Sequence, residues 1–183
     1  RKCISCNIGC ADHRIARSRP LRCSINPDII HGDAYKMRRV NRDTNVVVIG
    51  AGTAGMEAAC TAAEVGCHTW LLEAKNHVGG LASEISRLPE KKRIADFPQF
   101  MKNRIASLDN LMLQIGKRAD VASVSALRPH LIVNATGSTP LLPPIEGLRE
   151  NIDVENGKIF SITGMIDNLA KFTDIKGKRI AVV

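Results

Sequence analysis

The stretch that decides the fold runs from residue 46 to residue 55 and reads VVVIGAGTAG. Its aliphatic residues are typical of a buried parallel strand, and the spacing Gly-x-Gly-x-x-Gly follows at once. Gly50 permits a tight turn, Gly52 lets a pyrophosphate approach the backbone, and Gly55 lets the next helix pack close to the sheet. We expect that helix over residues 53–65, with the positive end of its dipole toward the phosphates.

A second predicted strand covers residues 67–72 and is followed by Glu73. An acidic residue at this distance from the glycines is where a dinucleotide-binding fold accepts hydrogen bonds from ribose hydroxyls. The strands, the helix and Glu73 together predict an α/β, Rossmann-like domain with a parallel sheet that binds a dinucleotide. The alternative is a glycine-rich turn in an α/β domain that binds no ligand.

Later segments extend the same sheet. Gly79 and Gly80 follow the second strand and either allow another close approach to a phosphate or form an ordinary loop. Thr136 and Gly137 come at the carboxyl end of a later strand, where open α/β sheets bind ligands. Three further elements are expected from the apolar pattern, namely a helix over residues 97–108 and strands over residues 111–115 and 131–133.

Charge and hydropathy limit the classes of function. The net charge is +8, and residues 1–43 hold ten Lys or Arg against four Asp. Such a basic segment is typical of nucleic-acid binding, but four cysteines share it, and anionic thiolates give the basic residues a local role. We therefore expect no nucleic-acid partner. No apolar run approaches the roughly 20 residues of a transmembrane helix, so we expect no membrane span.

Four of the six cysteines, Cys3, Cys6, Cys10 and Cys23, form a C-x2-C-x3-C-x12-C pattern. Cys-x-x-Cys lets two thiolates from one turn bind the same metal centre, and the other two would complete four soft ligands. Structural zinc usually has two close pairs of ligands, disulfides suit secreted domains, and an iron–sulfur cluster fits three close cysteines and a remote one. The spacing leaves these three alternatives open.

Both ends of the chain look cut, so we expect a piece of a longer protein. Residues 1–43 are interpreted as the cysteine-rich loop and a linker, and residues 44–175 as the nucleotide-binding domain. The last residues, KGKRIAVV at 176–183, echo TNVVVIG at 44–50 and are interpreted as the first strand of a further, truncated domain.

Taken in order, these motifs resemble the C-terminal half of the NADH:flavin oxidoreductases, a family that includes 2,4-dienoyl-CoA reductase and trimethylamine dehydrogenase. The resemblance rests on CISCNIGC with Cys23 followed by SINP, on VVVIGAGTAG with Glu73, on GGL, and on NATGSTPLLPPIEG. Leu81 is a departure, because many relatives carry a polar residue there. The family's FAD domain also usually resumes after an inserted NAD(P)H domain, so the chain would lack that closing segment.

The resemblance implies that Cys3, Cys6, Cys10 and Cys23 hold a [4Fe–4S] cluster and that the next domain binds FAD, or in some members only ADP. An FMN-bearing TIM barrel would precede Arg1, and an NAD(P)H-binding domain would begin at residues 179–183. Electrons would run from NAD(P)H to FAD, to the cluster and to FMN. The residues assigned to the FAD or ADP site are Gly50, Ala51, Gly52, Thr53, Ala54, Gly55, Glu73, Ala74, Lys75, Gly79, Gly80, Leu81, Val121, Ala135, Thr136 and Gly137.

The expected function is therefore that of a cofactor-carrying fragment of a flavin- and iron–sulfur-dependent NAD(P)H oxidoreductase. The sequence offers no convincing nucleophile–base pair or paired carboxylates, so no catalytic residue is assigned and the fragment alone is expected to be inactive. Its expected partners are its own TIM-barrel and NAD(P)H domains, with self-association through exposed core surface, and the expected compartment is the cytoplasm. The alternatives are a non-catalytic ADP-binding module and a zinc-bearing interaction domain.

Overall fold

The computed structural model describes residues 1–29 and 31–182, and the chain divides into two compact units, of which the second begins at Ser138. In the first unit, four parallel strands form a sheet in the order β3-β2-β1-β4. The predicted α/β fold with a parallel sheet is therefore confirmed. The strands are β1 (Asn45–Ile49), β2 (His68–Leu72), β3 (Leu111–Gln114) and β4 (Leu131–Asn134).

The register of the sheet brings the carboxyl ends of the strands to one edge. Ile49, the last residue of β1, pairs with Leu72 of β2 on one side and with Asn134 of β4 on the other. Leu72 in turn pairs with Gln114, the last residue of β3. The residues that follow these strands are therefore neighbours, although they are far apart in the sequence.

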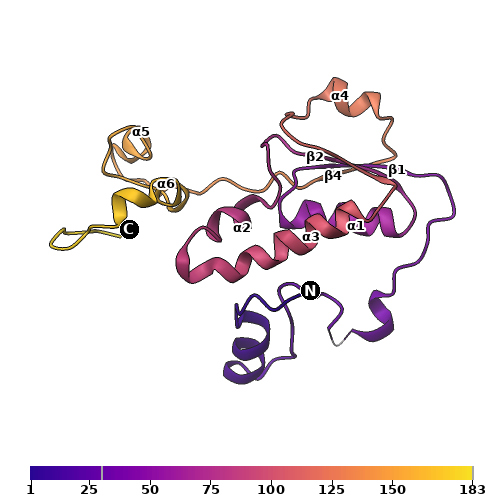
Figure 1. Ribbon diagram of the computed structural model, residues 1–183, viewed down its shortest axis with the longest axis horizontal. Coiled ribbons are helices and arrows are strands. Elements are labelled where there is room, and N and C mark those ends of the chain that lie inside the picture. The colour runs from indigo at the N-terminus through magenta and orange to yellow at the C-terminus, as the bar shows by residue number, and fades with distance from the viewer. Residues whose placement is uncertain (30, 183) are drawn as a thin grey trace. The chain divides into compact units, whose positions relative to one another are not determined.

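Helices cover both faces of this sheet (Figure 1). Helices α1 (Thr53–Glu64) and α3 (Asp96–Ala106) lie on one face, and the short α4 (Val121–Ala126) lies on the other. The larger apolar core, which includes Val48, Met56 and Met101, fills the space between the sheet and the first two helices. The smaller core is made by Val47, Leu72 and Val124 under α4.

The connections between the strands contain further short helices. The segment around residues 84–96 holds the end of α2 (Gly80–Ile85) and a 3-10 helix, η3 (Pro89–Ala95). Helix α4 contains two Val and two Ser, which form helices less readily than Ala, but Asp120 and Ser123 form a reciprocal capping box at its start. The cap satisfies backbone donors at the helix end and stabilises a helix that propensity alone does not predict.

The remaining segments are short helices and loops. They are the π-helix η1 (Ile8–Ala16), the 3-10 helices η2 (Gly32–Tyr35) and η4 (Leu169–Phe172), and helices α5 (Leu148–Asn151) and α6 (Ile162–Asp167). Ile30 of the expected linker and Val183 of the expected last strand lie outside the described residues. Residues 179–182 are not in a strand, and a strand needs a neighbouring strand for its hydrogen bonds. The domain bounds expected from the sequence stay predictions.

No helix among the described residues is both long and apolar enough to cross a membrane.

Candidate functional site: a glycine-rich turn at the carboxyl edge of the sheet

The turn between β1 and α1 contains three glycines. At two of them a side chain would overlap the protein backbone, and at the third there is room for one. Gly50 has a positive φ of 99°, and a Cβ there would overlap the carbonyl oxygen of Ala135. A Cβ on Gly55 would overlap the Gly50 carbonyl oxygen. At Gly52, by contrast, a Cβ would meet no protein atom within 4 Å. Gly52 therefore presents bare backbone to the outside at the start of α1, which is where a phosphate binds in such turns.

The second glycine pair packs directly on this turn. The Gly79 N–H donates a hydrogen bond of 2.8 Å to the Ala51 carbonyl oxygen. A Cβ on Gly80 would lie 2.9 Å from the Gly52 Cα, so only glycine fits between the two backbones. Gly79 and Gly80 both have positive φ, a conformation that glycine adopts without strain. They are thus structural partners of the first turn as well as candidates for phosphate contact.

Glu73 lies beside the turn and is held by two backbone donors. Its Oε2 accepts a hydrogen bond of 2.6 Å from the Ala51 N–H, and its Oε1 accepts one of 2.8 Å from the Lys75 N–H. An ionised carboxylate has about four acceptor positions. Both oxygens therefore keep capacity for further donors, as the predicted contact with ribose hydroxyls requires.

The end of β4 supplies the opposite side of the site. The Ala135 N–H donates to the Ile49 carbonyl oxygen at 2.8 Å, which ties this segment to the end of β1. Thr136 donates to the Asn134 side chain through its N–H (3.3 Å) and its Oγ1 (2.9 Å). Gly137 has a φ of 84° and open space at its Cβ position. Asn134 is not among the site residues predicted from the sequence, although a polar residue at the end of an apolar strand is a usable signal.

The other residues assigned to the cofactor differ in how close they lie to the turn. Thr53 and Ala54 are exposed on the first turn of α1, and Ala74 and Lys75 are exposed just after β2. Leu81 in α2 is 56% exposed, and Val121 is 85% exposed at the start of α4. Helices α1 and α4 cover opposite faces of the sheet (Figure 1), so Val121 belongs to a different face from the other assigned helix residues.

Basic side chains surround Glu84 of α2, close to the second glycine pair. Its Oε1 lies 3.2 Å from the Lys75 Nζ and 3.5 Å from the His77 Nε2, and its Oε2 lies 3.2 Å from an Arg87 nitrogen. Burial acts to raise the pKa of Glu84, but the hydrogen bonds from Lys75 and Arg87 outweigh it, and the pKa is lowered. The group stays ionised and orients Lys75 beside Glu73.

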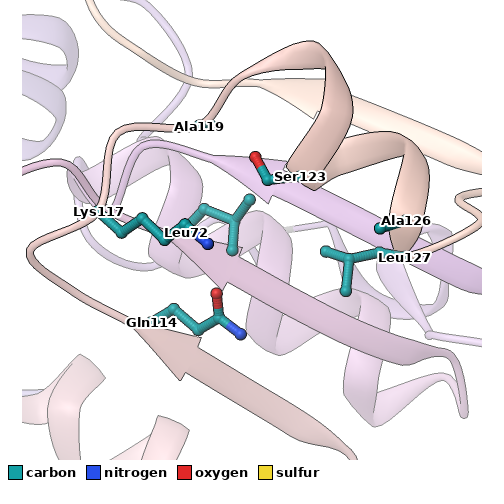
Figure 2. A pocket seen from close by; sticks show the side chains of 7 residues that line it. All are labelled: Leu72, Gln114, Lys117, Ala119, Ser123, Ala126 and Leu127. Carbon is teal, nitrogen blue, oxygen red and sulfur yellow. The ribbon is translucent and has the colours of Figure 1, made fainter.

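A pocket of about 230 Å³ lies on the α4 face of the sheet (Figure 2). It contains none of the residues assigned to the cofactor. A larger hollow of about 610 Å³ runs along α1, lined mainly by small and aliphatic side chains such as Ala58, Ala62 and Leu131. The residues that line the first pocket are Leu72, Gln114, Lys117, Ala119, Ser123, Ala126 and Leu127.

The cysteine-rich segment folds back on itself. The Arg22 N–H donates to the Gly9 carbonyl oxygen at 2.9 Å, and a Cβ on Gly9 would overlap the Arg22 carbonyl oxygen. The Cys6 Sγ lies 3.4 Å from the Ser24 Oγ, and this hydrogen bond is the main reason why the pKa of the Cys6 thiol is lowered. The segment around Cys23 is thereby held beside the residues that carry Cys6 and Gly9.

All six cysteines are free. In residues 1–29 and 31–182, no group of three or more His, Cys, Asp or Glu side chains is arranged to hold a metal ion. Cys60 and Cys67 are buried in the main core, as expected for small apolar residues. Burial raises the pKa of the Cys60 thiol to about 11. The assignment of the other four cysteines to a cluster stays a prediction.

Comparisons with known proteins indicate the family of the chain. A family described as FAD dependent oxidoreductase matches residues 45–118, from β1 past β3. NADH oxidase from Thermoanaerobacter brockii is 34% identical over 100% of this chain and 27% of its own length. Bilirubin reductase from Mediterraneibacter gnavus is 34% identical over 80% of this chain and 23% of its own length.

Among solved structures, 2-naphthoyl-CoA reductase in complex with 2-naphthoyl-CoA superposes on 82% of this chain and 23% of its own, with a TM-score of 0.76 and 29% identity. The chain thus spans about a quarter of the length of the relatives it matches. The chain belongs to the NADH:flavin oxidoreductase and dienoyl-CoA reductase family.

Proposed function

We propose that the chain binds FAD at the edge of the sheet, with the pyrophosphate against Gly52 and the adenosine ribose at Glu73. The observation that carries the proposal is the open space beside the Gly52 backbone. At Gly50 and Gly55, protein atoms already occupy the corresponding space. The first turn of α1 offers unpaired N–H groups to the phosphates. Bound FAD would accept electron pairs from a nicotinamide and release them one at a time.

We further propose that Cys3, Cys6, Cys10 and Cys23 hold a [4Fe–4S] cluster. Four free thiols are a suitable donor set for such a cluster. The contact between Gly9 and Arg22 supports the proposal, because it brings the backbone of the remote Cys23 next to the segment that carries Cys6 and Cys10. Free thiols of this kind suit a reducing compartment such as the cytoplasm.

In the longer protein, electrons would pass from NAD(P)H to FAD and then through the cluster to an FMN-bearing TIM barrel. The names of the relatives support this proposal, since one is an NADH oxidase and others are reductases of bilirubin and 2-naphthoyl-CoA. The partners of this chain would be its own barrel and its own NAD(P)H domain. The substrate pocket would lie in the barrel, so the chain alone would have no turnover.

The first experiment is an absorption spectrum of the chain purified without oxygen, with iron, zinc and released nucleotide assayed on the same sample. Flavin bands together with iron would support both proposals. ADP without flavin would favour a structural nucleotide, because the ADP half of FAD meets the same turn and the same carboxylate. Zinc in place of iron would contradict the cluster, and failure of added FAD or ADP to bind would contradict the nucleotide site.

A further inference from the structure

A chain of charged side chains joins the cysteine loop, defined as residues 1–25, to helix α1. Arg1 makes two contacts through different nitrogens of its guanidinium. Nη1 donates to the Ile25 carbonyl oxygen at 2.9 Å, and Nη2 lies 2.8 Å from the Glu57 Oε1. The same guanidinium lies 5.6 Å from the ring centroid of Phe100 in α3. One side chain therefore closes the two ends of the loop on each other and attaches them to the helical layer.

Glu57 is itself held firmly. Its Oε1 also accepts a hydrogen bond of 2.9 Å from Arg104 of α3. Arg104 is only 12% exposed in its side chain, and Glu64 binds it through two hydrogen bonds of 2.6 Å. A bidentate pair of this kind fixes the guanidinium in one orientation. Glu57 thus presents its carboxylate to Arg1 from a rigid support.

Glu57 lies close to the end of α1 that faces the proposed nucleotide site. Helix α1 begins at Thr53, directly after Gly52, and Glu57 lies one turn further on. We propose that Arg1 and Glu57 are positioning residues, which fix the cysteine loop against the helix whose first turn faces the nucleotide. The inference deepens the proposed function and rests on it for the cluster. Without the pair, residues 1–25 would lose the printed ion pair that joins them to α1.

Amide hydrogen exchange of the whole chain, followed by mass spectrometry, tests the attachment before any cofactor is added. Glu57→Gln removes the negative charge that forms the ion pair with Arg1. The amide exchange rate of residues 1–25 should then rise about two- to fivefold, the range for loss of one partly exposed ion pair. Glu64→Gln is the matched control, because it weakens the support of Arg104 but leaves the contact between Arg1 and Glu57. Arg1→Met removes the pair from the loop side and should reproduce the effect of Glu57→Gln.

Equal exchange of the loop in Glu57→Gln, Glu64→Gln and the unchanged chain would overturn the inference. So would a rise of the same size in both Glu variants, since that would mark a general loss of stability rather than a specific attachment.

A second readout uses the cluster itself. The chain is incubated without oxygen with ferrous iron and sulfide, and the visible absorbance is followed after a chelator is added. Bleaching should be about two- to fivefold faster in Glu57→Gln than in Glu64→Gln, because a detached loop opens more often. Equal bleaching rates would count against the positioning role. If the unchanged chain takes up no cluster, the proposed function fails, whereas the exchange measurement still decides whether the loop is attached.

Discussion

Substitution of Gly52 by alanine distinguishes the stability of the turn from its affinity for a nucleotide. Gly52 has a φ of −72° and a ψ of −173°, which any residue adopts without strain. The added methyl group would meet no protein atom within 4 Å. Alanine is a poorer N-cap than glycine but reduces the entropy of the unfolded chain, and these effects nearly cancel. We expect the free energy of unfolding to change by less than about 1 kcal/mol.

The same methyl group would occupy the space where the pyrophosphate lies. Forcing one methyl group into a filled contact costs about 1–3 kcal/mol, which weakens binding by roughly 5- to 150-fold. Titration calorimetry with FAD and with ADP measures the loss, and urea unfolding measures stability. Gly55→Ala is the control for a packing defect, because its Cβ would overlap the Gly50 carbonyl oxygen and should destabilise the fold. A Gly52→Ala chain that is equally stable and binds FAD as tightly as the unchanged chain would refute the phosphate site.

Three further predictions concern single side chains. Glu73→Gln should weaken FAD binding by about ten- to hundredfold in the same titration, because hydrogen bonds to a charged acceptor are lost. Cys23→Ala should remove most of the iron and visible absorbance gained on incubation with ferrous iron and sulfide, whereas Cys60→Ala should not, since Cys60 is buried in the core. Hydrogen bonds from Arg104 hold the pKa of Glu64 below its ordinary value of 4.5, so their stabilisation is present above that unfolded pKa and is lost as the pH falls through the folded one. Urea unfolding between about pH 2 and pH 7 should therefore show a weaker acid dependence in Glu64→Gln.

Each of these has an outcome that would count against it. Unchanged FAD affinity in Glu73→Gln would remove the carboxylate from the ribose contact. Full iron uptake by Cys23→Ala would mean that the remote cysteine is not a ligand. An acid dependence that is the same in Glu64→Gln and the unchanged chain would show that other carboxylates dominate.

The sequence predicts the centre of this structure because the information there is local. The strand, the glycine spacing and Glu73 follow one another within a single β–α–β unit, and the physical demands of the turn select the residues. The packing of Gly80 against Gly52 could not be predicted, since it depends on how a later helix returns to the turn. The contact of Arg1 with Glu57 is missed for the same reason, because a charged residue alone does not indicate its partner.

Helix α4 shows a different limit. Its six residues are two each of Val, Ala and Ser, which together give no clear helix preference, and the capping box at Asp120 and Ser123 is the signal that indicates a helix. The assignment of Val121 to the cofactor came from the resemblance alone, and the residue lies 85% exposed at the start of this helix.

The contact of Gly79 and Gly80 with the first turn sets the smallest segment that can hold this turn in shape. The turn after β1 is closed on one side by the Leu72 carbonyl of β2 and on the other by the Gly79 N–H. A segment that ends before α2 would therefore contain every glycine of the Gly-x-Gly-x-x-Gly sequence and still lack the rigid turn. The nucleotide site is therefore a property of three elements together, since its turn is held only where β1, β2 and the start of α2 meet.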